Sequence, residues 1–205
     1  MSVTLLLKKL KYKIMLTAKI EKAETLEEFY SQIRTQQEDT KHHGENYCAH
    51  HDFIQKYMPE CYSYKELGLH QGASAAAALL GGAKEVHLID HTLEKYNWEK
   101  HLFEKFAEEN DVSLNVYEMS SIDKRCAAGT DMLMIDSLHK WSWTIQELEL
   151  HSPYTKKYIV FHDTAIVNRK PSDIGPGVRE WCKDNDWEVL EEETRNVGSM
   201  IIKRV

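Results

Sequence analysis

Short apolar runs alternate with amphipathic stretches along most of the chain, from residue 62 onward. The stretches between the runs, at residues 74–80, 96–108 and 143–151, have helical spacing. Strands alternating with helices in this way predict βαβ units on a parallel sheet, and right-handed crossovers place helices on both of its faces. The apolar runs that we interpret as strands occupy residues 63–69, 85–90, 113–119, 131–136 and 157–162.

The last part of the chain breaks this alternation. We expect a helix at about residues 175–184, followed by two β-rich runs at 187–193 and 199–203, with a turn region around Asn196 and Gly198. Two strands this close in sequence pair in antiparallel fashion. The pattern therefore predicts an α/β fold whose mostly parallel, seven-stranded sheet ends in an antiparallel hairpin.

The first 60 residues differ from the rest. Residues 24–37 have helical spacing, and Thr25 is a plausible N-cap. The apolar positions within residues 5–16 are interrupted by lysines, so they fall short of the ~20 apolar residues of a membrane span and lack the apolar core of a signal peptide. We interpret residues 1–60 as a helical extension that covers the substrate pocket, and residues 61–205 as the ligand-binding domain.

Composition narrows the class of protein. A chain of 205 residues that is 42% hydrophobic fits one domain with one sizeable core. Its net charge of -7 gives no reason to expect nucleic acid as a partner. The four cysteines form no C-x-x-C pair, which argues against zinc-ribbon and redox motifs and is typical of buried thiols in a reducing compartment. We expect a cytoplasmic protein with neither a nucleic-acid nor a membrane partner; oligomerisation with copies of itself stays open.

One loop, with the sequence ELGLHQG at residues 66–72, joins the first strand to an alanine-rich helix. Gly68 and Gly72 would let the backbone turn sharply and approach a ligand closely. The helix that begins near Ala73 would point its amides at that ligand. Taken alone, the glycine pair is also explained by a tight strand-to-helix turn.

Polar residues at the ends of the next strands suggest which ligand the loop binds. Asp90 ends the second strand, where nucleotide-binding α/β folds hold a carboxylate against a ribose diol. The loop lacks the Gly-x-Gly-x-x-Gly cradle for a pyrophosphate, and Glu66 supplies a carboxylate for a cationic group such as an ammonium. Ser120 and Ser121 are placed to flank an adenine ring, although both could instead cap a helix. Together these features favour S-adenosylmethionine, bound by Glu66, Gly68, His70, Gln71, Gly72, Asp90, His91, Ser120, Ser121 and Asp136.

Candidate reactive groups end the fourth and fifth strands. Asp136 follows one apolar run, and His162 and Asp163 end the other. Because adjacent parallel strands lie roughly 4.8 Å apart, these groups can converge on one ion, and two acidic oxygens suit Mg²⁺. The alternatives are a helix cap for Asp136 and a loop turn for Asp163.

Histidines supply the remaining candidates. With Asp136, His139 forms the expected catalytic centre, because an imidazole that titrates near neutral pH can act as general base toward a hydroxyl. It could equally be a surface histidine at the start of a helix, or a metal could lower the hydroxyl pKa instead. His42, His43, His50 and His51 fit no common metal-site spacing and have no cysteine near them, so we expect a solvated cover over the substrate pocket.

Residues 62–200 resemble the branch of the methyltransferase superfamily that includes cephalosporin-hydroxylase-like proteins and magnesium-using small-molecule O-methyltransferases. The resemblance implies the Rossmann-like class I methyltransferase fold, its strand order, and methylation of an oxygen on a small molecule such as a sugar or a hydroxylated metabolite. The motifs that carry it are ELGLHQGAS, VHLIDH, MLMIDSLHKW, YIVFHDT and GPGVREW.

The resemblance also implies a divalent metal site formed by Asp136, His162 and Asp163. This chain departs from the family pattern because His162 and Thr164 flank Asp163. An imidazole shifts the preference from Mg²⁺ toward Mn²⁺, Fe²⁺ or Zn²⁺, unless the metal has been lost. Two alternative functions remain. One is a cephalosporin-hydroxylase-like protein of other activity; an iron-dependent oxygenase of this kind would need two histidines and a carboxylate that face one ion. The other is a non-catalytic module that binds S-adenosylmethionine.

Overall fold

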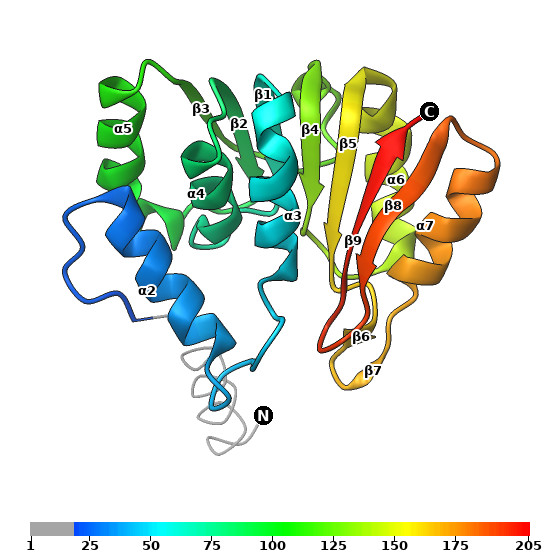
Figure 1. The fold of residues 1–205 in the computed structure, drawn as a ribbon. Coiled ribbons are helices and arrows are strands. Elements are labelled where there is room, and N and C mark those ends of the chain that lie inside the picture. Colours follow the sequence, from blue (N-terminus) through cyan, green and yellow to red (C-terminus); the bar gives the residue numbers. More distant parts are fainter. Residues whose placement is uncertain (1–18) are drawn as a thin grey trace, which may run out of the picture.

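The computed structural model describes residues 19–205, and the lysine-containing stretch at residues 5–16 lies outside them. A seven-stranded sheet runs through the molecule in the order β3-β2-β1-β4-β5-β9-β8 (Figure 1). The first five strands in this order are parallel, and β9 pairs antiparallel with both β5 and β8. The strands are β1 (Ser63–Leu67), β2 (Glu85–Asp90), β3 (Ser113–Glu118), β4 (Thr130–Ile135), β5 (Thr155–His162), β8 (Trp187–Glu193) and β9 (Ser199–Arg204).

Helices pack on both faces of the sheet. Residues of α2 to α5 bury one face and residues of α6 and α7 the other. Short 3-10 turns at 58–60, 96–98, 124–126 and 152–154 complete several connections. The helices are α2 (Leu26–Glu38), α3 (Ala49–Tyr57), α4 (Ala73–Leu80), α5 (Lys100–Glu109), α6 (Trp141–His151) and α7 (Ile174–Lys183).

The inner ends of β4 and β5 are apolar on both sides, as is typical of parallel strands between two helical layers, whereas β1 also buries Lys65 and Glu66. Met132 and Met134 of β4 pack under α3 and α4, whereas Leu133 and Ile135 point to the layer of α6 and α7. Every predicted strand and helix from residue 62 onward is present, with bounds shifted by at most a few residues. The sequence prediction of an α/β fold with a terminal antiparallel hairpin is therefore confirmed.

Residues before the first strand belong to the same core. Thr25 caps α2 by accepting a hydrogen bond from the Glu28 amide at 3.2 Å, as predicted. Phe29 and Ile33 of α2 and Ile54 of α3 are fully buried in the cluster that also contains α4. The extension is thus packed onto the sheet. Two features escaped prediction: α3 itself, and a small hairpin of β6 (Ile166–Val167) and β7 (Lys170–Pro171).

Within residues 19–205, no helix combines the length and the apolar character needed to cross a bilayer.

Candidate functional site

A cavity of about 740 Å³ opens at the carboxyl ends of β1, β2, β4 and β5 and is bordered by residues of α2 and α3. This is where the strand order reverses between β1 and β4, and open α/β sheets bind ligands at such a switch point. Its volume lies within the range of roughly 300–1,000 Å³ that ligand sites occupy. Of the residues predicted to bind the cofactor, eight line it: Gly68, His70, Gln71, Asp90, His91, Ser120, Ser121 and Asp136.

The loop after β1 is held against its neighbours by backbone contacts. Gly68 has φ +92°, and a Cβ atom there would lie 2.2 Å from the carbonyl oxygen of Asp136. Gly72 also has a positive φ, +86°, but a Cβ there would meet Phe103 at 2.8 Å, and Gly72 does not line the cavity. Packing against Phe103 of α5 therefore explains the glycine at position 72, and its approach to a ligand stays a prediction.

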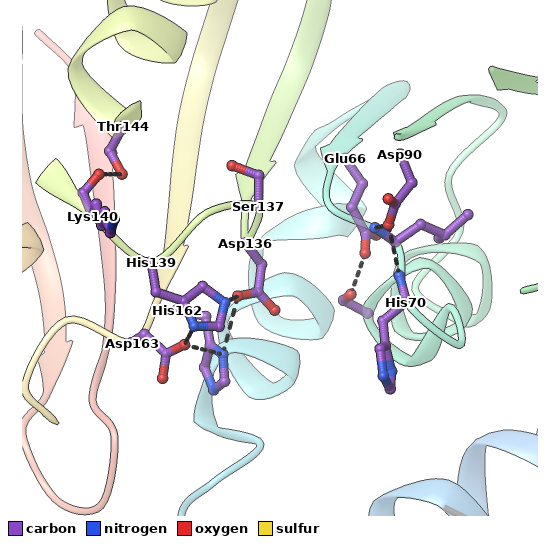
Figure 2. A network of polar contacts seen from close by, with 12 residues as sticks. Glu66, His70, Asp90, Asp136, Ser137, His139, Lys140, Thr144, His162 and Asp163 are labelled. Carbon is purple, nitrogen blue, oxygen red and sulfur yellow. Dashed lines mark hydrogen bonds and ion pairs between the residues drawn. The ribbon is translucent and has the colours of Figure 1, made fainter. Parts of the chain in front are cut away.

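Asp90 lies at the edge of the cavity, as predicted, and anchors the loop (Figure 2). Its Oδ2 atom accepts hydrogen bonds from the amides of Leu69 at 2.7 Å and His70 at 3.1 Å. Oδ1 accepts one from the amide of Thr92 at 3.2 Å and lies 2.8 Å from Nδ1 of His91. A carboxylate can accept about four hydrogen bonds. This arrangement joins β2 to the glycine loop and leaves the carboxylate facing the cavity.

Glu66 lies deeper than predicted. Its side chain is fully buried and does not line the cavity. Tyr64 donates a hydrogen bond to one carboxyl oxygen at 2.8 Å, and Ser74 donates to the other at 2.5 Å. Direct contact between Glu66 and a cationic group is therefore not available in this structure. Ser74 lines the cavity and lies between Glu66 and the space that a ligand would fill.

Burial is the main reason that the pKa of Glu66 is raised to about 8, against the lowering effect of its two hydrogen bonds. The folded protein therefore keeps this carboxyl protonated in a pH range where the unfolded chain ionises it. Stability must then fall as the pH rises from about 4.5 to about 8.

Glu66→Gln should remove this dependence. Between pH 5 and pH 8, we expect the free energy of unfolding of the variant to gain about 4 kcal/mol relative to the wild type, at 1.36 kcal/mol per pH unit. Urea unfolding at several pH values measures the difference, with Glu108→Gln, at an exposed position on α5, as the matched control. Parallel pH profiles for the wild type and the Glu66 variant would refute the assignment.

The groups at the ends of β4 and β5 converge as predicted (Figure 2). His139 lies between two carboxylates: its Nδ1 donates to Asp163 at 2.6 Å, and its Nε2 lies 3.3 Å from Asp136. Burial opposes the charged ring, but the hydrogen bonds and charges of both aspartates outweigh it and raise the pKa of His139 to about 11. A protonated imidazole cannot accept a proton. The predicted role of His139 as general base does not fit this charge state, and its position suits a cation that bridges the two aspartates.

His162 is buried beside Asp136, with Nδ1 3.3 Å from the carboxylate and Nε2 donating to the carbonyl of Tyr47 at 3.2 Å. Burial opposes its charged form, but Asp136 raises the pKa of the ring. Burial would likewise raise the pKa of Asp136, yet the two imidazoles of His162 and His139 hold it well below its usual range. Asp163 is buried with φ +57° and does not line the cavity.

The histidines of the N-terminal extension are not a solvated cover, contrary to our expectation. His42 is exposed and His43 stacks on Tyr47 with ring centroids 3.9 Å apart, but His50 and His51 are buried in α3. Burial lowers the pKa of His51 to about 3 and that of His50 well below its usual value, so both rings are neutral.

His50 is the residue at this site that sequence reasoning missed. Together with Asp136 and His162 it offers three ligand atoms within 4.8 Å of one another, as do Asp136, His139 and Asp163. Its place on a helix far from β4 and β5 in the sequence gave no spacing signal, because only the packing of α3 over the sheet brings it there.

No protein-family model and no curated protein sequence matches this chain. Solved structures do resemble it. The O-methyltransferase TomG from Streptomyces achromogenes, in complex with SAM, has a TM-score of 0.58 and 11% identity over 91% of this chain and 92% of its own. An O-methyltransferase from Bacillus cereus, in complex with SAH, has a TM-score of 0.58 and 15% identity over 91% and 93%.

The SAH-bound methyltransferase PaMTH1 from Podospora anserina aligns over the full length. Its TM-score is 0.59 and its identity 13%, with 100% of this chain and 97% of its own covered. Identities this low establish the fold alone. With its strand order and antiparallel β9, the chain has the Rossmann-like fold of class I methyltransferases.

Proposed function

We propose that this protein is an S-adenosylmethionine-dependent methyltransferase that acts on an oxygen of a small molecule, such as a sugar or a hydroxylated metabolite. The observation that carries the proposal is the carboxylate of Asp90 at the edge of the cavity, fixed to the glycine loop of a class I methyltransferase fold. The exposed ring of His91 occupies one acceptor position of this carboxylate, and when it moves away the carboxylate can accept a hydrogen bond from the ribose hydroxyls of the cofactor.

The cavity residues fit the rest of the cofactor. Ser120 and Ser121 lie beyond β3, where they can flank the adenine, while Ser74 and the loop after β1 face the amino-acid end. Glu66 would act on the ammonium through Ser74, to which it is hydrogen-bonded. S-adenosylmethionine supplies an electrophilic methyl group when it is bound.

The acceptor would occupy the part of the cavity under the N-terminal extension, lined by Gln37, His43, Tyr47 and His51. These side chains combine apolar ring surface with hydrogen-bonding groups, which suits a hydroxylated small molecule. The carboxylate of Asp136 lines the same cavity beside His139 and His162 and can accept a hydrogen bond from the acceptor hydroxyl. Alignment of that oxygen with the methyl carbon and sulfur would supply most of the rate.

Calorimetry with S-adenosylmethionine and S-adenosylhomocysteine tests the proposal first. We expect one equivalent of either compound to bind. Methyl transfer is then measured with labelled S-adenosylmethionine against a panel of sugars, phenols and hydroxy acids, and labelled product should form with at least one acceptor class. Failure to bind either compound would exclude the methyltransferase function, whereas binding without turnover on any acceptor would favour a non-catalytic module.

We also propose that the protein is located in the cytoplasm. All four cysteines are free thiols in the structure, which is consistent with a reducing compartment.

A further inference from the structure

Three potential metal ligands meet at the acceptor side of the cavity, each from a different element. His50 lies on α3, Asp136 follows β4, and His162 ends β5. All three line the cavity, and one ligand atom from each lies within 4.8 Å of the other two. Packing of the N-terminal extension on the sheet creates this cluster.

The spacing of the two sheet ligands matches that of ligands on a single ion. Nδ1 of His162 and Oδ1 of Asp136 are 3.3 Å apart. Ligands at about 2.0–2.1 Å from a tetrahedral ion are separated by about 3.3–3.4 Å. The other ring nitrogen of His162 donates to the carbonyl of Tyr47, an interaction of the kind that orients metal-binding imidazoles. It directs Nδ1 toward Asp136, and an ion bound there would replace the contact between Nδ1 and Oδ1.

His50 is buried, as a metal ligand would be. A histidine with a purely structural role would be expected to have hydrogen-bond partners for its buried ring nitrogens, and one nitrogen of His50 has none among the described residues. The residue is 4% exposed, and within residues 19–205 its Nδ1 atom has no hydrogen-bond partner. The ring lies against His162, with centroids 4.1 Å apart, and against His51 at 4.2 Å. Buried polar atoms in native proteins nearly always have a partner.

The other carboxylate of the predicted metal site is engaged elsewhere. Asp163 does not line the cavity, and His139 lies between it and Asp136. An all-oxygen Mg²⁺ site between the two aspartates therefore does not fit these side chains.

We propose that His50, Asp136 and His162 bind a divalent transition-metal ion, with Asp163 outside the ligand set. Two imidazoles and one carboxylate favour ions such as Zn²⁺, Co²⁺ or Fe²⁺ over Mg²⁺, which prefers oxygen ligands. Three protein ligands leave a further coordination position facing the cavity. Only the use of that position by an acceptor oxygen rests on the proposed function, because ion binding does not depend on methyl transfer.

Co²⁺ is a suitable probe, because its visible absorption reports the ligands around it. The purified protein, treated with chelator and dialysed, is titrated with CoCl₂ and followed by its spectrum, and Zn²⁺ and Mg²⁺ compete in parallel. We expect one Co²⁺ per chain, displaced by Zn²⁺ and not by millimolar Mg²⁺. His50→Ala should weaken Co²⁺ binding at least about 100-fold.

Two controls separate the ligand set from its surroundings. His42→Ala removes an exposed histidine of the same segment, and Asp163→Asn retains a residue type that tolerates the positive φ of this position. Both variants should keep the Co²⁺ spectrum. If His50→Ala does not fold by circular dichroism, His50→Gln takes its place. Tighter binding of Mg²⁺ than of Co²⁺, loss of the spectrum in Asp163→Asn alone, or equal Co²⁺ affinity of the His50 and His42 variants would overturn the proposal.

Binding of S-adenosylhomocysteine in the presence of chelator is measured on the same samples. A protein that binds this compound but gives no Co²⁺ spectrum refutes the metal site alone. A protein with the Co²⁺ spectrum but no affinity for the compound refutes the methyltransferase function alone.

Discussion

Asp90→Ala is expected to weaken the binding of S-adenosylhomocysteine by at least about 100-fold. The substitution removes the acceptor for the amides of Leu69 and His70, so the glycine loop loses its anchor to β2. It also removes the proposed partner of the ribose hydroxyls. Hydrogen bonds to a charged group contribute about 1.5–3 kcal/mol each, and two of them account for a loss of this size.

Calorimetry at constant pH and salt measures the effect. Asp184→Ala, at an exposed aspartate that follows α7, is the matched control and should bind as the wild type does. Asp90→Asn, which keeps one oxygen acceptor, should fall between the two. A thermally intact Asp90→Ala protein whose affinity stays within about threefold of the wild type would refute the assignment of Asp90 to the cofactor.

Gly68→Ala should be the most destabilising of the substitutions considered. A Cβ atom at this position would lie 2.2 Å from the carbonyl oxygen of Asp136 and 2.6 Å from its carbon. Both are backbone atoms, so the loop after β1 or the loop after β4 must move. We expect the free energy of unfolding to fall by at least about 3 kcal/mol, since strain and lost packing add to the cost of a left-handed backbone.

Gly82→Ala measures the part of this loss in the free energy of unfolding that comes from the left-handed backbone alone. Gly82 has φ +103°, close to that of Gly68, but a Cβ atom there has no neighbour within 4 Å. Alanine at this position should cost only about 1–2 kcal/mol. Urea unfolding curves of both variants give the two values. Equal losses would mean that the contact between Gly68 and Asp136 is not tight in solution.

Much of the site could be predicted because strand ends can be recognised in the sequence. Asp90, Asp136 and His162 each end an apolar run, and parallel strands carry their carboxyl ends to the same edge of the sheet. Their meeting at one cavity followed from this alone. The glycine loop could be recognised for the same reason, since it follows the first such run.

The burial of individual side chains and their charge states could not be predicted in this way. Glu66 precedes Gly68 by two residues in the motif, yet only the packing of Tyr64 and Ser74 around it shows that its carboxyl is buried. Gly72 looks equivalent to Gly68 in the sequence but faces Phe103. These differences depend on side chains from other elements, which local sequence does not specify.

The same limit applies to the histidines. His139 was expected to be neutral because an isolated imidazole titrates near neutral pH. Its pKa is set by two carboxylates, and one of them, Asp163, comes from the next strand along the sheet. His50 has no recognisable spacing to its neighbours in the site, since α3 reaches them only by packing over the sheet.

The sequence by itself therefore determined the strands, the helices and the polar residues that end the strands, because hydrophobic periodicity and strand-end positions are local properties. The tertiary structure alone decided which side chains reach the cavity, which carboxyl is protonated, and which histidine joins Asp136 and His162. Burial and charge–charge contacts are properties of groups brought together from distant parts of the chain, and their energies exist only once the helices and loops are packed on the sheet.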